Sequence, residues 1–395
     1  MTLKTDLRTR LASRQARLGT ETAFETLARA RKLEREGRHI IHLEIGEPDF
    51  DTPEHIRQAA KDALDNGFTH YGPSAGQMEL REAIARHQSE RQGYEISPER
   101  VIVTPGGKPV MFFTIMALIE AGDEAIYPNP GFPIYESMIN YMGGTAVPVA
   151  LREEFDFSLD VEELESLITD RTKLIIVNTP NNPCGSIIPP EDLRRIAELA
   201  VQHDLVVLSD EIYKDMYYQG EHDSITQFPD MVDRTVILDG FSKSYAMTGW
   251  RLGYGVFPEW LVEPISRLMT NSVSCTSVFS QMAAVAALQG PQDSVGTMME
   301  EFTARRDLVV EGLNSLPGVT CKVPKGAFYA FPNISGTGLS SKQFADKALY
   351  EAGVALLAGT AFGKYGDGYI RISFANSREN LNEGIKRLRK MLVGE

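Results

Sequence analysis

The stretch LIIVNTPNNPCGSIIPPEDLRRIAELAVQHDLVVLSDEIY, from Leu174 to Tyr213, contains the structural unit that recurs along this chain. Its two short apolar runs, Leu174–Asn178 and Val206–Ser209, are typical of buried strands. Between them, Glu191–His203 has the apolar spacing of an amphipathic helix, and prolines and acidic residues mark its start. A strand, a helix and a second strand in this order predict a βαβ unit and a parallel sheet.

The same alternation of strand and helix continues on both sides of this stretch. A further helix is predicted over Lys108–Glu120. More strands are predicted at Val101–Thr104, Glu124–Tyr127, Thr145–Val149, Val236–Asp239 and Leu252–Val256. We therefore expect an α/β fold in which helices flank a mostly parallel, seven-stranded sheet.

The alternation ends at about residue 290, where a second kind of organisation begins. The remaining sequence predicts a long charged helix, two short strands and a last helix at Gln292 to about Ser315, Gly326–Phe331, Tyr369–Phe374 and Arg378–Leu392. We expect a large domain over residues 51–290, and a smaller α+β domain formed by residues 1–50 together with residues 291–395.

The composition disfavours several classes of protein. The 395 residues carry a net charge of −14, which argues against nucleic acids and anionic membranes as partners. Cys184, Cys275 and Cys321 are scattered and form no CxxC pair, so neither a disulfide framework nor a structural zinc site is expected. No apolar run reaches the roughly 20 residues of a membrane span, and the N-terminal segment lacks the apolar core of a secretory signal. We expect a cytoplasmic protein.

Polar residues follow four of the predicted strands at the point where each strand ends. They are Pro105-Gly106-Gly107-Lys108, Thr179-Pro180-Asn181-Asn182-Pro183, Asp210-Glu211-Ile212-Tyr213 and Gly240-Phe241-Ser242-Lys243. Ligands of open parallel sheets bind beyond the carboxyl ends of the strands. The four segments therefore predict one shared site.

The segment Gly106-Gly107-Lys108 lies between a predicted strand and a predicted helix. Two glycines allow the backbone to approach an anion, and a helix N-terminus offers free N–H groups. The segment therefore indicates a phosphate site, although it does not match a Walker loop. The alternative is an ordinary tight turn.

Two other residues at strand ends have side chains that can carry chemistry. A desolvated Lys243 close to a second cation would have a lowered pKa and would be able to form a Schiff base. A buried Asp210 would stay ionised only beside a positive partner, such as a protonated pyridine nitrogen. The alternatives are a surface lysine, whose amine extends into solvent, and an aspartate that caps a helix.

Arg371 stands among apolar residues in the predicted strand Tyr369–Phe374. An arginine in this setting needs an anion, and its planar fork matches a carboxylate. That anion is either a bound carboxylate or an internal aspartate or glutamate.

These residues carry a family resemblance. The chain resembles the class I and II aminotransferases, which are fold-type I pyridoxal phosphate enzymes, and among them the aspartate and aromatic aminotransferase group. The resemblance extends from Gly46-Glu47-Pro48-Asp49-Phe50 to Tyr369-Ile370-Arg371-Ile372-Ser373. Its most specific block is SKSYAMTGWR, at Ser242–Arg251, and Asn181–Gly185 and Asp210–Tyr213 also match.

The resemblance implies a role for each matched residue. Lys243 corresponds to the lysine that holds the cofactor as a Schiff base and shuttles the proton. Asp210 corresponds to the aspartate that keeps the pyridine nitrogen protonated, and Tyr213 and Asn182 to the residues that bind the 3′-oxygen. The remaining cofactor-binding positions are Gly106, Gly107, Lys108, Phe132, Ser242, Arg251 and Tyr71, the last one reaching the neighbouring subunit's cofactor. The substrate α-carboxylate is assigned to Arg371, Asn182 and the Gly46 backbone.

The implied activity is amino transfer from an L-amino acid (aspartate, aromatic or related) to a 2-oxo acid by a ping-pong mechanism. The implied assembly is a homodimer with shared sites, in which Asn271–Thr276 also lines the neighbour's pocket. A lyase or a cyclising enzyme of specialised metabolism on the same scaffold is the alternative. A transcription regulator with an aminotransferase-like domain is disfavoured by the negative charge and by the short segment before Gly46.

Overall fold

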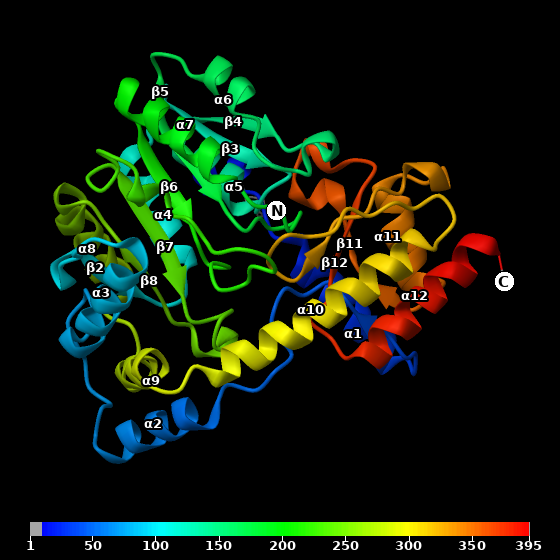
Figure 1. The fold of residues 1–395 in the computed structure, drawn as a ribbon, viewed down its shortest axis with the longest axis horizontal. Coiled ribbons are helices and arrows are strands. Elements are labelled where there is room, and N and C mark those ends of the chain that lie inside the picture. The colour runs from blue at the N-terminus through cyan, green and yellow to red at the C-terminus, as the bar shows by residue number, and fades with distance from the viewer. Residues whose placement is uncertain (1–9, 395) are drawn as a thin grey trace, which may run out of the picture.

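The computed structural model describes residues 10–394, so the first residues of the N-terminal segment discussed above lie outside it. A seven-stranded sheet forms the centre of its larger part (Figure 1). In spatial order the strands are β2 (Val101–Thr104), β8 (Gly253–Val256), β7 (Thr235–Gly240), β6 (Val206–Asp210), β5 (Thr172–Asn178), β3 (Glu124–Asn129) and β4 (Thr145–Ala150). The strands from β7 to β4 are parallel, whereas β8 is antiparallel to both of its neighbours. The predicted α/β fold with a mostly parallel sheet of seven strands is confirmed.

Helices cover both faces of this sheet because its strands are apolar on both sides. On β5, Ile176 packs with one buried cluster, and Ile175 and Val177 pack with the cluster on the opposite face. One face is covered by α4 (Lys108–Leu118), α5 (Ile134–Met142) and α8 (Glu259–Val273). The other face is covered by α3 (Met78–Gln92), α6 (Val161–Leu167), α7 (Pro190–Gln202) and α9 (Val278–Gln289), and α2 (Glu54–Asp65) packs against α9. Alternating side chains of a strand point to opposite faces, so two helical layers are needed.

A second group of elements packs mainly around a further apolar cluster. Its helices are α1 (Thr22–Arg35), α10 (Asp293–Asn314), α11 (Ser341–Tyr350) and α12 (Arg378–Val393). Its strands are β1 (Ile41–His42), β9 (Tyr329–Ala330), β10 (Val354–Ala355), β11 (Leu357–Ala358) and β12 (Ile370–Ser373). Figure 1 shows α10 running from the side of α9 to lie along α12. Helix α1 packs with α11 and β10 in a smaller cluster. The parallel pairing of β1 with β10 joins a segment that precedes the large sheet to one that follows it.

One predicted element is shorter in the structure than the sequence pattern indicates. The expected strand Gly326–Phe331 forms regular pairs only at Tyr329–Ala330. Ala327 adopts a left-handed backbone with φ of 55°, and Gly326 makes an isolated bridge with Tyr217. A residue with positive φ interrupts the extended backbone that a strand requires, so the apolar run bends before it pairs.

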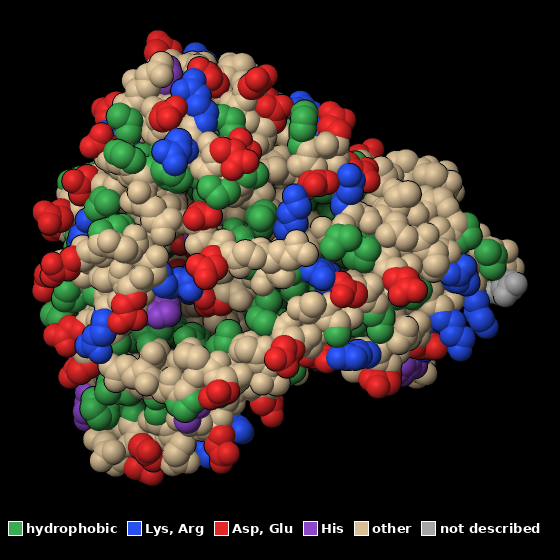
Figure 2. Space-filling model, viewed as in Figure 1, with side chains coloured by type: hydrophobic (Ala, Val, Ile, Leu, Met, Phe, Trp, Pro, Cys, Tyr) green, Lys and Arg blue, Asp and Glu red, His purple; other side chains and the backbone are tan. Residues whose placement is uncertain are grey.

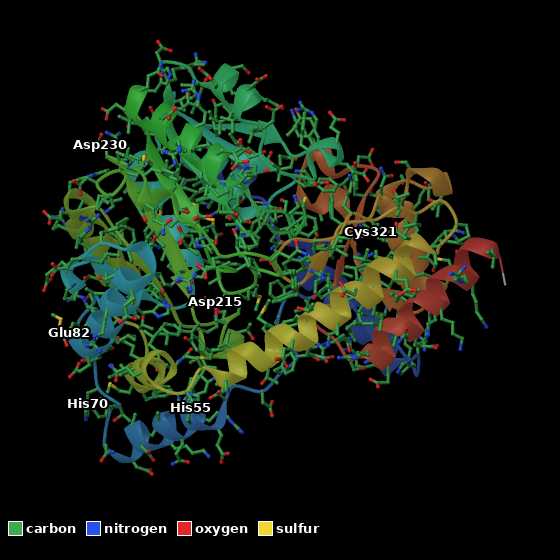
Figure 3. The ribbon with its side chains drawn as sticks, in the orientation of Figure 1. His55, His70, Glu82, Asp215, Asp230 and Cys321 are labelled. Carbon is green, nitrogen blue, oxygen red and sulfur yellow. The ribbon has the colours of Figure 1, made fainter. Side chains whose placement is uncertain are left out.

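The three cysteines are free thiols that lie apart from one another. Cys184 and Cys321 are buried in separate apolar clusters, and Figure 3 labels Cys321 among the C-terminal elements. Burial raises the pKa of Cys184 well above its ordinary value. Cys184 therefore serves as a small packing group and not as a thiolate.

The surface mixes charges of both signs. On the face shown in Figure 2, acidic and basic side chains are interspersed. Among the helices of residues 10–394, none combines the length and apolarity that a membrane crossing demands.

A buried ionic network lies behind the carboxyl edge of the sheet. The Lys214 ammonium lies 2.6 Å from Asp239 and 3.4 Å from Asp215. Tyr254 and Gln88 also donate to the Asp239 carboxylate, at 2.5 and 2.9 Å. Burial by itself would lower the pKa of Lys214, but the charges of Asp215 and Asp239 outweigh it and raise that pKa.

We expect Asp239→Ala to destabilise the protein by about 3–5 kcal/mol, because it leaves the buried Lys214 ammonium with one partner fewer. The measurement is the midpoint of urea unfolding. Glu165→Ala is the matched control, since the Arg195–Glu165 pair is exposed at 41% and 45% and should contribute less than about 1 kcal/mol. Equal losses in the two variants would contradict a structural role for the network.

Candidate active site

The predicted site residues gather in one cavity at the carboxyl edge of the sheet. This cavity has a volume of about 490 Å³. Among the residues that line it are Gly46, Gly107, Lys108, Phe132, Asn182, Asp210, Tyr213, Ser242, Lys243, Arg251 and Arg371. Gly106 lies directly behind the wall, against Arg251. Tyr71 does not reach this cavity, and its side chain is 90% exposed.

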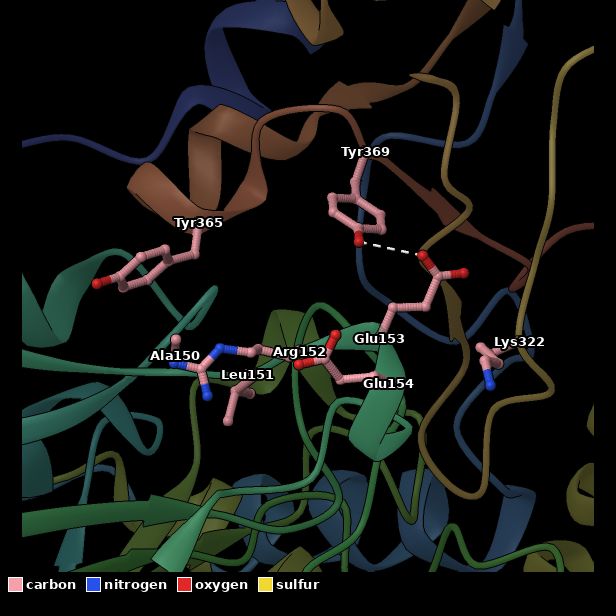
Figure 4. Close-up of a pocket in the computed structure, with 8 residues that line it drawn as sticks. All are labelled: Ala150, Leu151, Arg152, Glu153, Glu154, Lys322, Tyr365 and Tyr369. Atoms are coloured by element: carbon pink, nitrogen blue, oxygen red, sulfur yellow. Dashed lines mark hydrogen bonds between the residues drawn. The ribbon is translucent and has the colours of Figure 1, made fainter. Parts of the chain in front are cut away.

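A second cavity of about 540 Å³ lies beyond the end of β4 and includes none of the predicted residues (Figure 4). Three of its charged groups, Arg152, Glu153 and Lys322, already have partners within the chain. Glu153 accepts hydrogen bonds from Tyr369 at 3.1 Å and from Asn333 at 2.8 Å. Arg152 is paired with Asp160 at 3.3 Å. The two volumes are similar, so the chemistry of the lining residues assigns the candidate site to the first cavity.

Lys243 ends inside the cavity and does not extend to the surface. Its amine donates to the carbonyl oxygen of Gly46 at 2.5 Å and lies 5.6 Å from the ring centroids of both Tyr213 and Phe328. Burial, assisted by the positive charge of Arg371, lowers the pKa of Lys243 to about 8. A larger fraction of this amine is therefore uncharged near neutral pH than for an ordinary lysine, as a nucleophile requires.

Asp210 ends strand β6 with a fully buried carboxyl group. Tyr135 donates to its Oδ2 at 2.5 Å, and the backbone N–H of Ile212 donates to its Oδ1 at 3.3 Å. Burial raises the pKa of Asp210 to about 6 despite these hydrogen bonds. No regular helix follows β6 directly, so Asp210 does not act as a helix cap. A cationic ligand atom in the cavity would stabilise its charged form.

Hydrogen bonds join the segments that follow β5 and β6 to each other and to strand β9. The Tyr213 and Tyr329 hydroxyls are 2.6 Å apart. The Asn178 side chain donates to the Asp210 carbonyl oxygen at 3.1 Å and accepts from the Asn182 N–H at 2.9 Å. These contacts hold Tyr213, Asn182 and Asp210 in one rigid wall of the cavity.

Arg371 is buried, and no aspartate or glutamate in the described part of the chain forms an ion pair with it. Its guanidinium carbon lies 4.6 Å from the ring centroid of Tyr329 and 5.0 Å from that of Phe362. One nitrogen donates to the carbonyl oxygen of Glu44, and another donates to Asn182 Oδ1 at 3.4 Å. Within residues 10–394 its Nε has no hydrogen-bond partner. The alternative of an internal salt bridge is not met within these residues, so the cavity is left with a cation that a bound carboxylate would satisfy.

The segment before α4 forms a concave surface beside Arg251. Gly106 has a φ of 86°, and an added Cβ there would collide with the Arg251 guanidinium. Gly107 and the start of α4 supply N–H groups that have no partner within the helix. The Lys108 ammonium points elsewhere and pairs with Glu21 at 2.5 Å.

Some residues of this site gave no signal in the sequence. Tyr135 lies in an apolar stretch of α5 and resembles a core residue, yet it is the hydrogen-bond partner of Asp210. Glu21 precedes α1 and has the pattern of an ordinary surface residue. Neither position has a local feature that distinguishes it, because its partner lies far away in the chain.

The cavity fits pyridoxal phosphate in each of its functional groups. Lys243 offers an amine for the aldehyde, and the buried Asp210 offers an acceptor for the ring N–H. Tyr213 and Asn182 offer hydrogen bonds for the 3′-oxygen. Arg251 and the glycine segment offer a cationic surface for the phosphate.

We expect Lys243→Met to raise the stability of the cofactor-free protein. The pKa of Lys243 is lowered from 10.5 to about 8, so at pH 7 the buried ammonium costs the folded state about 3 kcal/mol. As the pH rises, folded wild type loses this proton at a lower pH than the unfolded chain does. The stability advantage of Lys243→Met over wild type should therefore shrink between pH 8 and 10.5. Thermal unfolding midpoints at pH 7 and pH 10 measure it, and a mutant less stable than wild type at pH 7 would contradict the burial cost.

Comparison with known proteins places this chain in a family. The model of the class I and II aminotransferases matches residues 38–388. The aspartate aminotransferase of Pyrococcus abyssi is 44% identical, over 90% of this chain and 92% of that protein. The aromatic-amino-acid aminotransferase 2 of Thermococcus litoralis is 44% identical, over 89% of this chain and 92% of that protein.

Solved structures agree with the sequence comparison. The aspartate aminotransferase from Thermus thermophilus with maleate has a TM-score of 0.93 and is 37% identical, covering 96% of this chain and 99% of its own. The aromatic aminotransferase from Pyrococcus horikoshii has a TM-score of 0.88 at 43% identity, covering 90% of this chain and 96% of its own. The chain therefore belongs to the class I and II aminotransferases, the pyridoxal phosphate-dependent enzymes that transfer an amino group from an amino acid to a 2-oxo acid.

Proposed function

We propose that the side chains of the cavity divide the amino-transfer reaction among them, with Lys243 as the reacting amine. The observation that most supports this assignment is the meeting of three buried groups in one cavity. They are Lys243, whose pKa is lowered, and Asp210 and Arg371, neither of which has an oppositely charged partner among the described residues.

The proposed roles follow from the chemistry that the site must perform. Bound pyridoxal phosphate supplies an electron sink, which allows an amino acid to lose the proton on its Cα. Asp210 holds the proton on the ring nitrogen, and Tyr135 keeps the Asp210 carboxyl group in place. Tyr213 and Asn182 donate hydrogen bonds to the 3′-oxygen. Lys243, once released from the cofactor, would take the proton from Cα and deliver it to C4′ of the cofactor.

The substrate is held at its carboxylate end. Arg371 and Asn182 bind the α-carboxylate, with the Gly46 backbone beside them. Phe132 covers the ring of the cofactor, and Gly106, Gly107, Ser242 and Arg251 hold its phosphate, which fixes the ring for the reaction. Lys108 is also predicted to bind the cofactor, but its ammonium pairs with Glu21, so we propose no phosphate contact for it.

The division into domains is part of the proposal. Residues 51–290 contain the sheet and the cofactor site, and residues 1–50 with 291–395 contribute Gly46 and Arg371. Substrate contacts thus come from both parts. The three free thiols support a reducing compartment, and we propose the cytoplasm.

We also propose that the active unit is a homodimer with shared sites. Tyr71 is 90% exposed, although a tyrosine in a phosphate-binding role must reach a cofactor. Its loop is joined to α9, because the backbone N–H of Gln77 donates to Gln281 Oε1 at 2.7 Å. Of the predicted segment Asn271–Thr276, the first three residues form the last turn of α8, Asn271–Ser274 is exposed, and Thr276 is buried. A two-fold contact through these segments would bring both of them to the partner's cavity.

Lys243→Ala should abolish turnover and the covalent attachment of the cofactor. Borohydride treatment should fix pyridoxal phosphate permanently to wild type, and peptide mapping should locate it on Lys243. Lys342→Ala is the control, because Lys342 is an exposed lysine on α11. Labelling of another lysine in wild type would remove Lys243 from its proposed role.

Subunit mixing tests the shared sites. Under conditions that exchange subunits, a Lys243→Ala chain and a Tyr71→Ala chain should form heterodimers with one site that carries both changes and one that carries neither. Activity should then exceed that of either parent. Activity equal to the average of the two parents would show that Tyr71 acts only within its own chain.

A further inference from the structure

Glu21 places a negative charge in the wall of the active-site cavity. It is the residue before α1, and its carboxylate pairs with the Lys108 ammonium at 2.5 Å. Both residues line the same cavity as Arg371. A smaller adjoining pocket is also lined by Glu21, Phe132, Asn182 and Arg371, so Glu21 faces the carboxylate-binding end directly.

The Lys108 ammonium already has an acidic partner and aromatic neighbours within this chain. Besides its ion pair, it lies 5.3 Å from the ring centroid of Phe132 and 6.0 Å from that of Phe24. A substrate group that needs this ammonium must therefore displace Glu21 or share the space beside it.

The other cations of the cavity have separate tasks in the proposed mechanism. Lys243 reacts with the cofactor, Arg251 holds its phosphate, and Arg371 binds the α-carboxylate. No cation without an acidic partner is then left among the described lining residues for a second carboxylate on the substrate.

The wall around Glu21 and Lys108 is mainly carbon. The apolar residues that line this part of the cavity are Ala23, Phe24, Leu27, Ile45, Met111 and Phe132. An apolar or aromatic side chain gains free energy by covering such a wall. A second carboxylate would be desolvated there beside the like charge of Glu21, which is unfavourable.

We propose that Glu21 determines substrate specificity, by neutralising Lys108 and so favouring amino acids with uncharged, apolar or aromatic side chains over aspartate and glutamate. This inference rests on the proposed binding of the α-carboxylate by Arg371. A residue just before α1 thereby determines which substrate side chains the cavity prefers, although the reactive groups of the cavity come from the sheet.

The first experiment compares wild type, Glu21→Gln and Glu25→Gln, each loaded with cofactor. Half-reactions with L-aspartate and L-phenylalanine are followed by the cofactor absorbance. Wild type should favour phenylalanine. Glu21→Gln should raise the ratio of kcat/KM for aspartate to that for phenylalanine by about tenfold or more, mainly through a lower KM for aspartate.

Glu25→Gln is the matched control. Glu25 lies on the first turn of the same helix, is exposed, and does not line the active-site cavity. The Glu25→Gln variant removes one negative charge from the same surface but leaves the Glu21–Lys108 pair intact. It should therefore leave the ratio of the two kcat/KM values unchanged. An equal effect of both variants would show that overall charge, and not the Glu21–Lys108 pair, sets the preference, and would overturn the proposal.

The second experiment measures binding without turnover. Dissociation constants of succinate and 3-phenylpropionate, which lack the reacting amine, are measured by titration calorimetry on the holoenzyme. In Glu21→Gln the dissociation constant of succinate should fall by about tenfold, and that of 3-phenylpropionate should stay within twofold of the wild-type value. Adding Lys108→Met to Glu21→Gln should remove that gain, because the freed ammonium is then gone.

The outcomes separate this inference from the proposed function. A wild type that prefers aspartate to phenylalanine, or an unchanged succinate affinity in Glu21→Gln, overturns the role of Glu21. A wild type that converts no amino acid while Glu21→Gln still gains succinate affinity would instead contradict the proposed turnover and leave the role of Glu21 supported.

Discussion

The burial of the Lys243 amine is the constraint on which the rest of the site depends. An ammonium group that leaves water is strongly destabilised unless it is paired or loses its proton. Here the amine has one carbonyl acceptor, two aromatic rings beside it and a pKa lowered to about 8. The rest of the fold must supply the free energy that keeps this amine buried. The reactive amine therefore lowers the stability of the folded enzyme.

The ionic network behind the sheet provides part of that support. Ser244 follows Lys243 in the chain, and its hydroxyl donates to Asp215 at 2.6 Å. Lys214 follows Tyr213, and its ammonium pairs with Asp215 and Asp239. Figure 3 labels Asp215 in the body of the molecule. Lys243 and Tyr213 line the cavity, whereas the residues that follow them, Ser244 and Lys214, bind the carboxylates of the ionic network.

Much of this arrangement follows from local patterns. Short β-branched runs separated by helices predict a parallel sheet, and a parallel sheet brings all its carboxyl ends to one edge. For that reason the positions of Asp210, Asn182 and Lys243 near one another could be inferred before any contact was known. The strand expected at Gly326–Phe331 is where this reasoning is least accurate, because the left-handed backbone of Ala327 is set by packing and not by its side chain.

The sequence by itself therefore determined the α/β fold, the family and the edge of the sheet where chemistry occurs, since these depend on periodicity and on motifs of adjacent residues. Only the tertiary structure decided which charges meet. Tyr135 reaches Asp210 across 75 residues, and Lys108 reaches Glu21 across 87. Arg371 is buried with its Nε unpartnered among the described residues. Electrostatic pairing depends on distance in space and on exclusion of water, and neither quantity is encoded in the spacing of residues along the chain.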